Sequence, residues 1–415
     1  MRFIRLVSAA SLVLPVLGFV VPREQDSLHI STENRDAFFS FNLRIGDDDH
    51  KHPKHPPKHP KDPKDPHPPP HPHPPHNDKP GDGDAGKTIL EVISNDEAFS
   101  KLWSFVKERE TLVKALNSSD ADLTLFAPVD SAFWEHGGGH GKHRPPPPPE
   151  IITQGLLYHV VDHQHKEEDL KNGQLLDTGL TLGSLGDKPQ KIRVFEHKHH
   201  VALNLRSHII KDDIKASNGI IQAIDHILMP PPDLFHVTVR FPKIFGLLAL
   251  AVKRAGLEEY LKETKTITLF APTNWAFKKL GVKKLKYLFS HKGKEELKKI
   301  LSYHVSTELV YGPEILEAKN KQLPTAEGHH LNVTVKDKDP EHGHKHQVIE
   351  INDQAHAFIT DGIAANGVLH AIDHVLSVPK DEDGEGDDDD EEDVMEAVLE
   401  YLMDEEDDEG YDFAW

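Results

Sequence analysis

The chain has 415 residues, no cysteine and a formal net charge of −21. The lack of cysteine excludes disulfide bonds, thiol catalysis and thiolate metal sites, so the fold must be stabilised by packing. Residues 381–415 contain 20 Asp and Glu and neither Lys nor Arg, which leaves the rest of the chain nearly neutral. We expect no nucleic-acid partner.

Residues 1–18 are predicted to be a secretory signal peptide. Arg2 and Arg5 precede an apolar stretch that Pro15 interrupts and that is short for a membrane span, and the residues up to Gly18 suit cleavage. A retained signal anchor is the alternative. We expect a secreted chain, extracellular or in a cell wall, with no membrane span after cleavage; a vacuolar location is the alternative.

Residues 19–86 are predicted to form a disordered arm. Residues 22–46 are a short mixed segment, and in 47–86 the prevalence of His, Pro, Lys, Asp and Gly leaves too few apolar side chains to offset the entropy of folding. Clustered imidazoles can bind divalent metals, but their spacing defines no geometry, so we expect low-specificity binding and no dedicated cofactor. The candidate metal ligands, in the arm and in a later loop, are His50, His52, His55, His59, His136, His140 and His143.

Two folded domains are predicted, at 87–230 and 233–379, joined at a run of prolines. Thr124-Leu-Phe-Ala-Pro-Val-Asp-Ser-Ala-Phe133 is repeated 144 positions later as Thr268-Leu-Phe-Ala-Pro-Thr-Asn-Trp-Ala-Phe277. A Tyr-His pair and an Asn-Gly block recur in the same order, at offsets of 145 and 148. This spacing matches a whole domain and is too long for a solenoid repeat. The chain therefore contains one domain type twice.

Each copy is predicted to contain both helices and strands. Apolar residues at helical spacing predict helices over 99–116 and 244–261, and the Thr-Leu-Phe-Ala segments predict buried strands that end at proline. Asp130 and Asn274 are expected to cap the helices that follow. Further strands are predicted at 192–195, 201–205, 208–210, 220–228, 331–335, 347–351 and 368–376.

These blocks resemble the motifs of the fasciclin domain family, as found in fasciclin-like and beta-Ig-H3 type secreted proteins, and we expect a fungal member. The resemblance covers about residues 87–379 and implies an α+β fold, in which each domain is a bent seven-stranded β-sandwich with helices packed at one end. The residues that carry it are Phe126, Pro128, Asp130, Tyr158, His159, Asn218 and Asp225 in the first copy, and Phe270, Pro272, Asn274, Tyr303, His304, Asn366 and Asp373 in the second.

The motif residues have both structural and functional interpretations. The Tyr-His pairs could bind a ligand, but their apolar neighbours favour a core role. Asp225-His226 and Asp373-His374 resemble half of a catalytic dyad, yet no serine in a nucleophile-elbow context accompanies them, so we expect no enzyme. The family's proposed receptor-binding pair, acidic then aliphatic, matches Asp213-Ile214 only weakly.

The copies differ where the first carries a Gly-His-Pro loop over 136–149 and the second carries a predicted helix over 281–300. Asn117 and Asn332 begin acceptor sequences for N-glycosylation. Residues 380–415 are predicted to be a disordered acidic tail, in which 394–403 has the pattern of a helix that could fold on a partner.

The function predicted from the sequence is that of a secreted, non-enzymatic adhesion or cell-wall and matrix protein. Its partner would be an extracellular protein or a wall or matrix component. Two alternatives remain: an accessory subunit of a secreted oxidase or other extracellular enzyme, and a vacuolar or endomembrane fasciclin protein.

Overall fold

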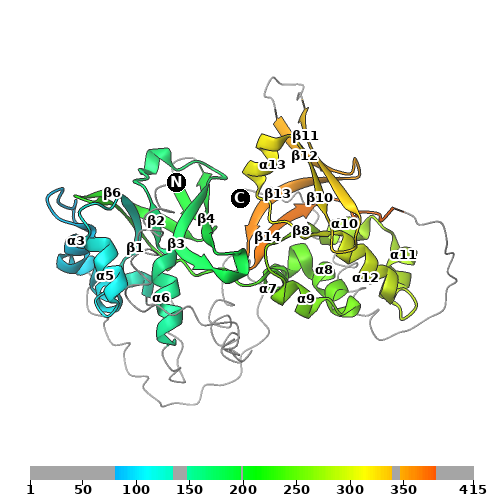
Figure 1. Ribbon diagram of the computed structural model, residues 1–415, viewed down its shortest axis with the longest axis horizontal. Coiled ribbons are helices and arrows are strands. Elements are labelled where there is room, and N and C mark those ends of the chain that lie inside the picture. Colours follow the sequence, from blue (N-terminus) through cyan, green and yellow to red (C-terminus); the bar gives the residue numbers. More distant parts are fainter. Residues whose placement is uncertain (1–79, 134–146, 198–199, 339–345, 380–415) are drawn as a thin grey trace, which may run out of the picture. The chain divides into compact units, whose positions relative to one another are not determined.

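The computed structural model describes residues 80–133, 147–197, 200–338 and 346–379 (Figure 1). The predicted signal peptide, arm and acidic tail lie outside these residues, as does most of the Gly-His-Pro loop. By their contacts, the residues form two compact units. Among the described residues, the first unit comprises 80–133, 147–169 and 206–227, and the second comprises 170–197, 200–205, 228–338 and 346–379.

In the first unit, three short α-helices precede the first strand of the sheet, and a fourth lies between the first and second strands. The predicted helix over 99–116 is two helices, because Arg109 has an extended backbone conformation between them. Thr88 begins the first helix with a capping box, in which its side chain and that of Glu91 each accept a backbone N–H of the other residue. The helices are α3 (Ile89–Asn95), α4 (Ser100–Val106), α5 (Glu110–Asn117) and α6 (Pro149–Tyr158).

The strands of this unit lie in the order β2, β1, β7, β6, and β1 is parallel to β7. Every residue of β1 and β7 is buried, because the helices pack over apolar side chains such as Ile89, Phe99 and Leu125. The strands are β1 (Leu123–Pro128), β2 (Val160–Asp162), β6 (Ser207–Ala216) and β7 (Gly219–Ile224).

The helices of the second unit follow the same plan. Gly256 adopts a left-handed conformation and ends the helix that begins at Pro242. The predicted helix over 244–261 is therefore two helices, α8 and α9. The predicted helix over 281–300 is confirmed as two helices, α11 and α12. The helices are α7 (Leu234–Arg240), α8 (Pro242–Ala255), α9 (Glu258–Glu263), α10 (Asn274–Lys278), α11 (Val282–Phe289), α12 (Lys294–Tyr303) and α13 (Gly312–Ala318).

A seven-stranded sheet in the order β10, β11, β12, β13, β14, β8, β9 forms the body of the second unit. Strand β8 is parallel to β14, and Ile267 lies opposite Gly367 as Leu123 lies opposite Gly219 in the first unit. The strands are β8 (Ile267–Pro272), β9 (Val305–Ser306), β10 (Asn320–Pro324), β11 (His330–Lys338), β12 (His346–Ile351), β13 (Ala355–Ile363) and β14 (Gly367–Ile372).

Three more strands belong to the second unit by their contacts: β3 (Leu175–Leu182), β4 (Lys188–His197) and β5 (His200–Leu203). The buried Gln190 amide donates to the Ala364 carbonyl at 2.9 Å, and Thr266 N–H donates to the Ser184 carbonyl at 3.0 Å. Each sequence repeat thus carries seven strands, β1–β7 and β8–β14, together with helices, and the predicted α+β class is confirmed.

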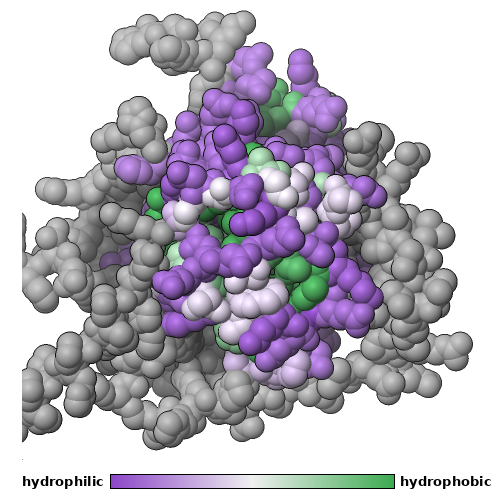
Figure 2. Space-filling view, turned by 90° about the vertical axis from the view of Figure 1, so that its left-hand side faces the viewer, coloured by the Kyte–Doolittle hydropathy of each residue, from purple (hydrophilic) through white to green (hydrophobic). Residues whose placement is uncertain are grey.

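Figure 2 shows one face of the molecule coloured by hydropathy. On that face, hydrophobic side chains of the described residues lie in small groups among hydrophilic ones. Among the described residues, no helix is both long enough and apolar enough to cross a membrane.

Candidate functional site

The Phe-Ala-Pro motifs lie in the cores of their units. Phe126 in β1 and Phe270 in β8 are fully buried. Each motif proline is the last residue of its strand, where Pro128 lies opposite Ile224 and Pro272 lies opposite Ile372. A proline at a strand end removes no interior hydrogen bond of the sheet. These residues build the scaffold and offer no exposed chemistry.

Asp130 and Asn274 do not cap the helices that follow them, contrary to the prediction. Thr273 is the N-cap residue of α10. The Asn274 side chain instead accepts the Leu247 N–H at 2.9 Å, and the Asp130 carboxylate accepts the Lys101 N–H at 2.8 Å. Both motif residues therefore bind backbone N–H groups of the preceding helices, α4 and α8, and connect those helices to the helical turn that follows the strand.

The Tyr-His pairs occupy equivalent buried positions at the ends of α6 and α12. His159 Nδ1 donates to the Gly155 carbonyl at 2.7 Å, and His304 Nδ1 donates to the Ile300 carbonyl at 2.8 Å. His304 Nε2 also accepts the Leu376 N–H at 3.0 Å. Burial lowers the pKa of His159 and of His304 to about 4, so both rings are neutral at physiological pH. This geometry supports a core role.

Asn218 and Asn366 each join three segments of the chain. The Asn366 side chain accepts the Leu234 N–H at 3.0 Å and donates to the carbonyls of Leu261 and Thr264 at 2.9 and 2.7 Å. Asn218 makes the matching bonds, accepting the N–H of Ile89 at 2.8 Å. A short amide side chain suits this task because it carries both an acceptor and two donors.

Replacing Asn366 with alanine should lower the free energy of unfolding by about 3 kcal/mol, because the buried Leu234 N–H and the two carbonyls lose their partner. Chemical denaturation followed by circular dichroism measures the change. Asn320→Ala, at an exposed position of β10, is the matched control and should change stability by less than about 0.5 kcal/mol. Equal effects of the two variants would contradict the role assigned to Asn366.

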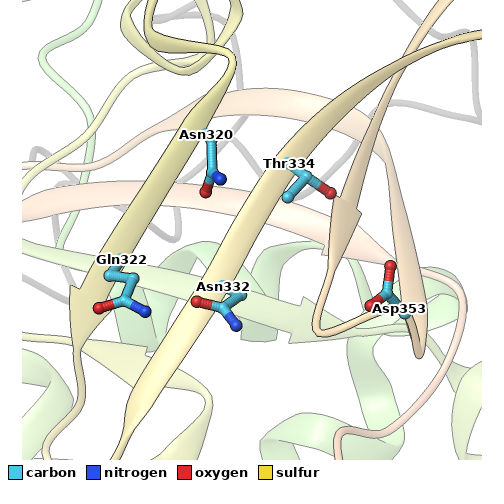
Figure 3. Close-up of a pocket in the computed structure, with 5 residues that line it drawn as sticks. All are labelled: Asn320, Gln322, Asn332, Thr334 and Asp353. Carbon is cyan, nitrogen blue, oxygen red and sulfur yellow. The ribbon is translucent and has the colours of Figure 1, made fainter.

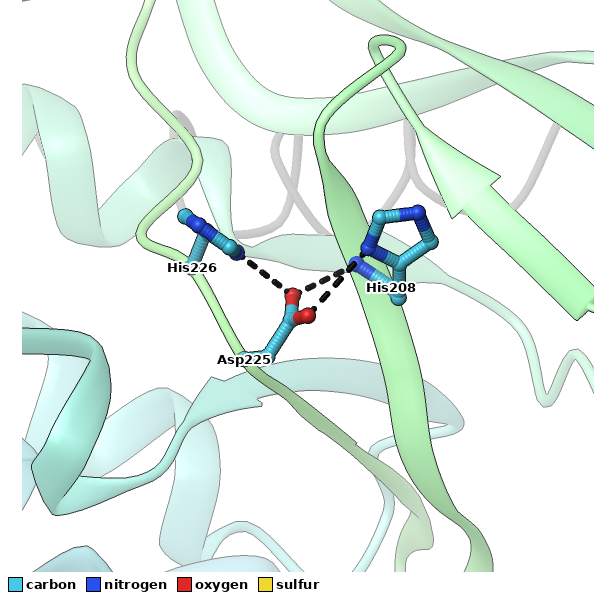
Figure 4. A group of neighbouring side chains, drawn as sticks. All are labelled: His208, Asp225 and His226. Atoms are coloured by element: carbon cyan, nitrogen blue, oxygen red, sulfur yellow. Dashed lines mark hydrogen bonds and ion pairs between the residues drawn. The ribbon is translucent and has the colours of Figure 1, made fainter. Parts of the chain in front are cut away.

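Asp225 lies between two histidines. Its carboxylate is 2.8 Å from His226 Nδ1 and 3.2 Å from His208 Nδ1, and it also accepts the His208 backbone N–H at 2.7 Å. Figure 4 shows His208 reaching the carboxylate from β6, while Asp225 and His226 follow the end of β7. The second histidine of this group, His208, was missed as a site residue in the sequence, although the same 148-residue offset relates it to His356.

The second repeat contains the matching group with one addition. Asp373 accepts the His356 N–H at 2.7 Å and lies 3.0 Å from His374 Nδ1. Burial raises the pKa of Asp373, but the hydrogen bonds from His356 and His374 outweigh it, and the net pKa is lowered. Lys279 Nζ donates to His374 Nε2 at 3.0 Å and lies 3.1 Å from the centre of the Trp275 ring. A serine could not use this histidine as a base, because the lysine occupies the nitrogen remote from Asp373.

The other predicted site residues are distributed as follows. The seven histidines proposed as metal ligands lie outside the described residues. Ile214 is buried, so the Asp213-Ile214 pair presents no aliphatic side chain to a receptor. Asn117 and Asn332 are both exposed, as glycosylation requires.

Asn332 lies in a shallow polar depression on strands β10 and β11 (Figure 3). Its side chain shares a strand face with Thr334, because alternate residues of a strand point the same way. Asp353, in the turn between β12 and β13, borders the depression. A surface lined by amide, hydroxyl and carboxylate groups is suited to hydrogen bonding with polar ligands. The lining residues are Asn320, Gln322, Asn332, Thr334 and Asp353.

Comparison with known proteins places the repeats in one family. The Fasciclin domain profile matches residues 97–230 and 244–379. Transforming growth factor-beta-induced protein ig-h3 of Sus scrofa is 28% identical over 313 residues, which cover 75% of this chain and 41% of that protein. This chain thus spans less than half the length of that relative.

Two fungal relatives are similar over more of their own length. Aurofusarin biosynthesis cluster protein S of Gibberella zeae is 27% identical over 332 residues, covering 70% of this chain and 77% of that protein. A fasciclin-like arabinogalactan protein of Arthroderma benhamiae is 26% identical over 305 residues, covering 71% and 68%.

Among solved structures, a FAS1 domain pair from the insect cell adhesion molecule Fasciclin I matches with a TM-score of 0.34 and 19% identity, covering 68% of this chain and 97% of that one. The family profile covers both repeats, including every motif block that the sequence repeats. The chain therefore belongs to the fasciclin domain family.

Proposed function

We propose that this protein is a secreted, non-enzymatic adhesion protein that associates with a cell wall or extracellular matrix. The observation that carries the proposal is the presence of two fasciclin domains within one chain. One relative is named a fasciclin-like arabinogalactan protein. The leader at residues 1–18 would direct secretion, and the segments at 19–86 and 380–415 would act as charged extensions.

The hydrogen bonds of the described motif residues are consistent with a structural role in the domains. The Tyr-His pairs and the Asn residues hydrogen-bond to backbone groups inside the units. Lys279 donates a hydrogen bond to His374 of the Asp373-His374 pair. Binding would then use exposed polar surfaces such as the depression at Asn332, or the charged extensions, rather than a catalytic pocket.

The full chain, expressed with an epitope tag in a fungal host, should be recovered from the medium or from the wall fraction. Deletion of residues 1–18 should retain it inside the cell, because the signal is lost. Immunoblotting of medium, wall, membrane and soluble fractions measures the distribution. Sequencing the N-terminus of the secreted protein checks cleavage near Gly18. Equal secretion with and without residues 1–18 would contradict the assignment of the leader.

An accessory role beside a biosynthetic enzyme is the second candidate. The supporting observation is the similarity to aurofusarin biosynthesis cluster protein S, of which the chain covers 77%. Affinity purification of the tagged full chain from native secreted material, followed by mass spectrometry, separates the candidates. Stoichiometric recovery of an oxidase favours the accessory role, and recovery of wall or matrix components alone favours adhesion.

A further inference from the structure

Each repeat places one carboxylate between two histidines at equivalent positions. His208, Asp225 and His226 of the first repeat correspond to His356, Asp373 and His374 of the second, each 148 positions later. In both groups the Asp accepts the backbone N–H of the first histidine at 2.7 Å. In both, the first histidine's carbonyl accepts the Asp N–H, at 3.1 and 3.2 Å. This reciprocal pairing fixes the carboxylate and the β6 or β13 histidine side by side.

The first group has the donor set and the spacing of a metal site. One ligand atom from each of its three residues lies within 4.8 Å of the other two. The side chains of His208, Asp225 and His226 are 50%, 30% and 20% exposed, so an ion could enter and water could complete its coordination. In a tetrahedral zinc site, with bonds of about 2.0–2.2 Å, neighbouring ligand atoms are about 3.3–3.6 Å apart. His208 Nδ1 lies 3.2 Å from one carboxylate oxygen of Asp225 and His226 Nδ1 lies 2.8 Å from the other, distances close to this range.

We propose that His208, Asp225 and His226 bind a divalent transition-metal ion of the zinc class. Two neutral imidazole nitrogens and one carboxylate oxygen suit such an ion, whereas Ca²⁺ and Mg²⁺ prefer sites built from oxygen ligands. The backbone N–H of His208 holds the carboxylate in place, as second-shell hydrogen bonds do in known metal sites. Three protein ligands leave one position for water or for a ligand group of a partner.

The second group, His356, Asp373 and His374, is not suited to bind a metal ion. A lysine ammonium has no lone pair, so Lys279 must donate to His374 Nε2, and His374 Nδ1 must then carry the ring proton. Because Lys279 occupies Nε2, this proton cannot move there when a metal approaches, so Nδ1 keeps no lone pair for a metal, and the ammonium also repels a cation. By the 144-residue offset, the residue at the position of Lys279 in the first repeat is Glu135. The second repeat therefore provides an internal control in the same chain.

The test compares matched variants of the full chain. The apparent melting temperature is measured against free Zn²⁺ fixed by a metal buffer, with Mg²⁺ in place of Zn²⁺ as the second probe. Zn²⁺ should raise the melting temperature, because the site joins β6 to the segment after β7 only in the folded state. His208→Asn and His226→Asn should each weaken the apparent zinc affinity at least about tenfold, since losing an outer-shell partner alone costs that much.

His356→Asn and His374→Asn should leave the zinc response unchanged, and Mg²⁺ should produce none. Each variant is compared with its own zinc-free sample, so a loss of basal stability does not affect the result. The histidine-rich arm is present in every variant and contributes equally to each measurement. Equal zinc responses in all four variants, or a loss confined to the second pair, would show that these histidines only hydrogen-bond within the protein and would overturn the proposal.

Discussion

Alanine at Gly219 or Gly367 is expected to lower the free energy of unfolding by about 3 kcal/mol or more, a large part of the stability of a marginally stable domain. These glycines begin β7 and β14, where the strand lies directly against its parallel neighbour. A Cβ at Gly219 would lie 2.1 Å from the Leu123 carbonyl oxygen, and a Cβ at Gly367 would lie 2.1 Å from that of Ile267. Both obstacles are backbone atoms of a buried strand, so the clash can be relieved only by separating the strands.

Gly155→Ala is the matched control for these variants. Gly155 lies within helix α6, and a Cβ there would meet nothing within 4 Å. Alanine should therefore keep or increase stability, by up to about 1 kcal/mol, because it favours the helix more than glycine does. Denaturant unfolding followed by circular dichroism compares the three variants. If Gly155→Ala destabilised the protein as much as Gly219→Ala, steric contact between the strands would not be the cause.

The second large effect is a loss of stability in acid that arises from His159 and His304. Each has a folded-state pKa of about 4, whereas an unfolded histidine titrates near 6.5. Between these values the unfolded chain binds more protons, so the stabilisation present above pH 6.5 is lost as pH falls toward 4. Each buried ring should contribute about 3 kcal/mol to that loss, since one pKa unit corresponds to about 1.4 kcal/mol. Burial also lowers the pKa of His370, which acts in the same direction.

The variant His304→Gln isolates this effect. It should be less stable than the natural chain at pH 7, because glutamine cannot make both ring hydrogen bonds in the same geometry, but its stability should fall less between pH 6.5 and 4. Urea unfolding measured across that range gives the slope. His291→Gln, at an exposed position, should leave the slope unchanged. A slope equal to that of the natural chain in His304→Gln would contradict the burial argument.

Much of the fold could be predicted from the sequence because the relevant signals are local. The Phe-Ala-Pro blocks were expected to be buried strands, and β1 and β8 are buried at every residue. The helix at 99–116 was predicted as one element because its apolar spacing continues through the break. The chain leaves the helical path at Arg109, whose side chain donates to the Phe105 carbonyl, and periodicity carries no signal for such a break.

The candidate site was harder to predict, since its members meet through strand pairing. The register of β6 against β7 shifts twice between Ile209 and Ile214, so counting along the strands could not place His208 opposite Asp225. The role of Asn274 was also misplaced. Its partner, the Leu247 N–H, is 27 positions earlier in the chain, and no local pattern connects the two.

The sequence by itself determined the duplicated fasciclin architecture, the α+β class and the motif residues, because repeated blocks and residue periodicity are properties of the chain alone. Only the tertiary structure decided which histidines share a carboxylate and how the two copies differ. Lys279 and His374 are 95 positions apart, yet their hydrogen bond fixes which ring nitrogen carries the proton. Protonation and ligand geometry depend on distances between side chains, and folding sets those distances.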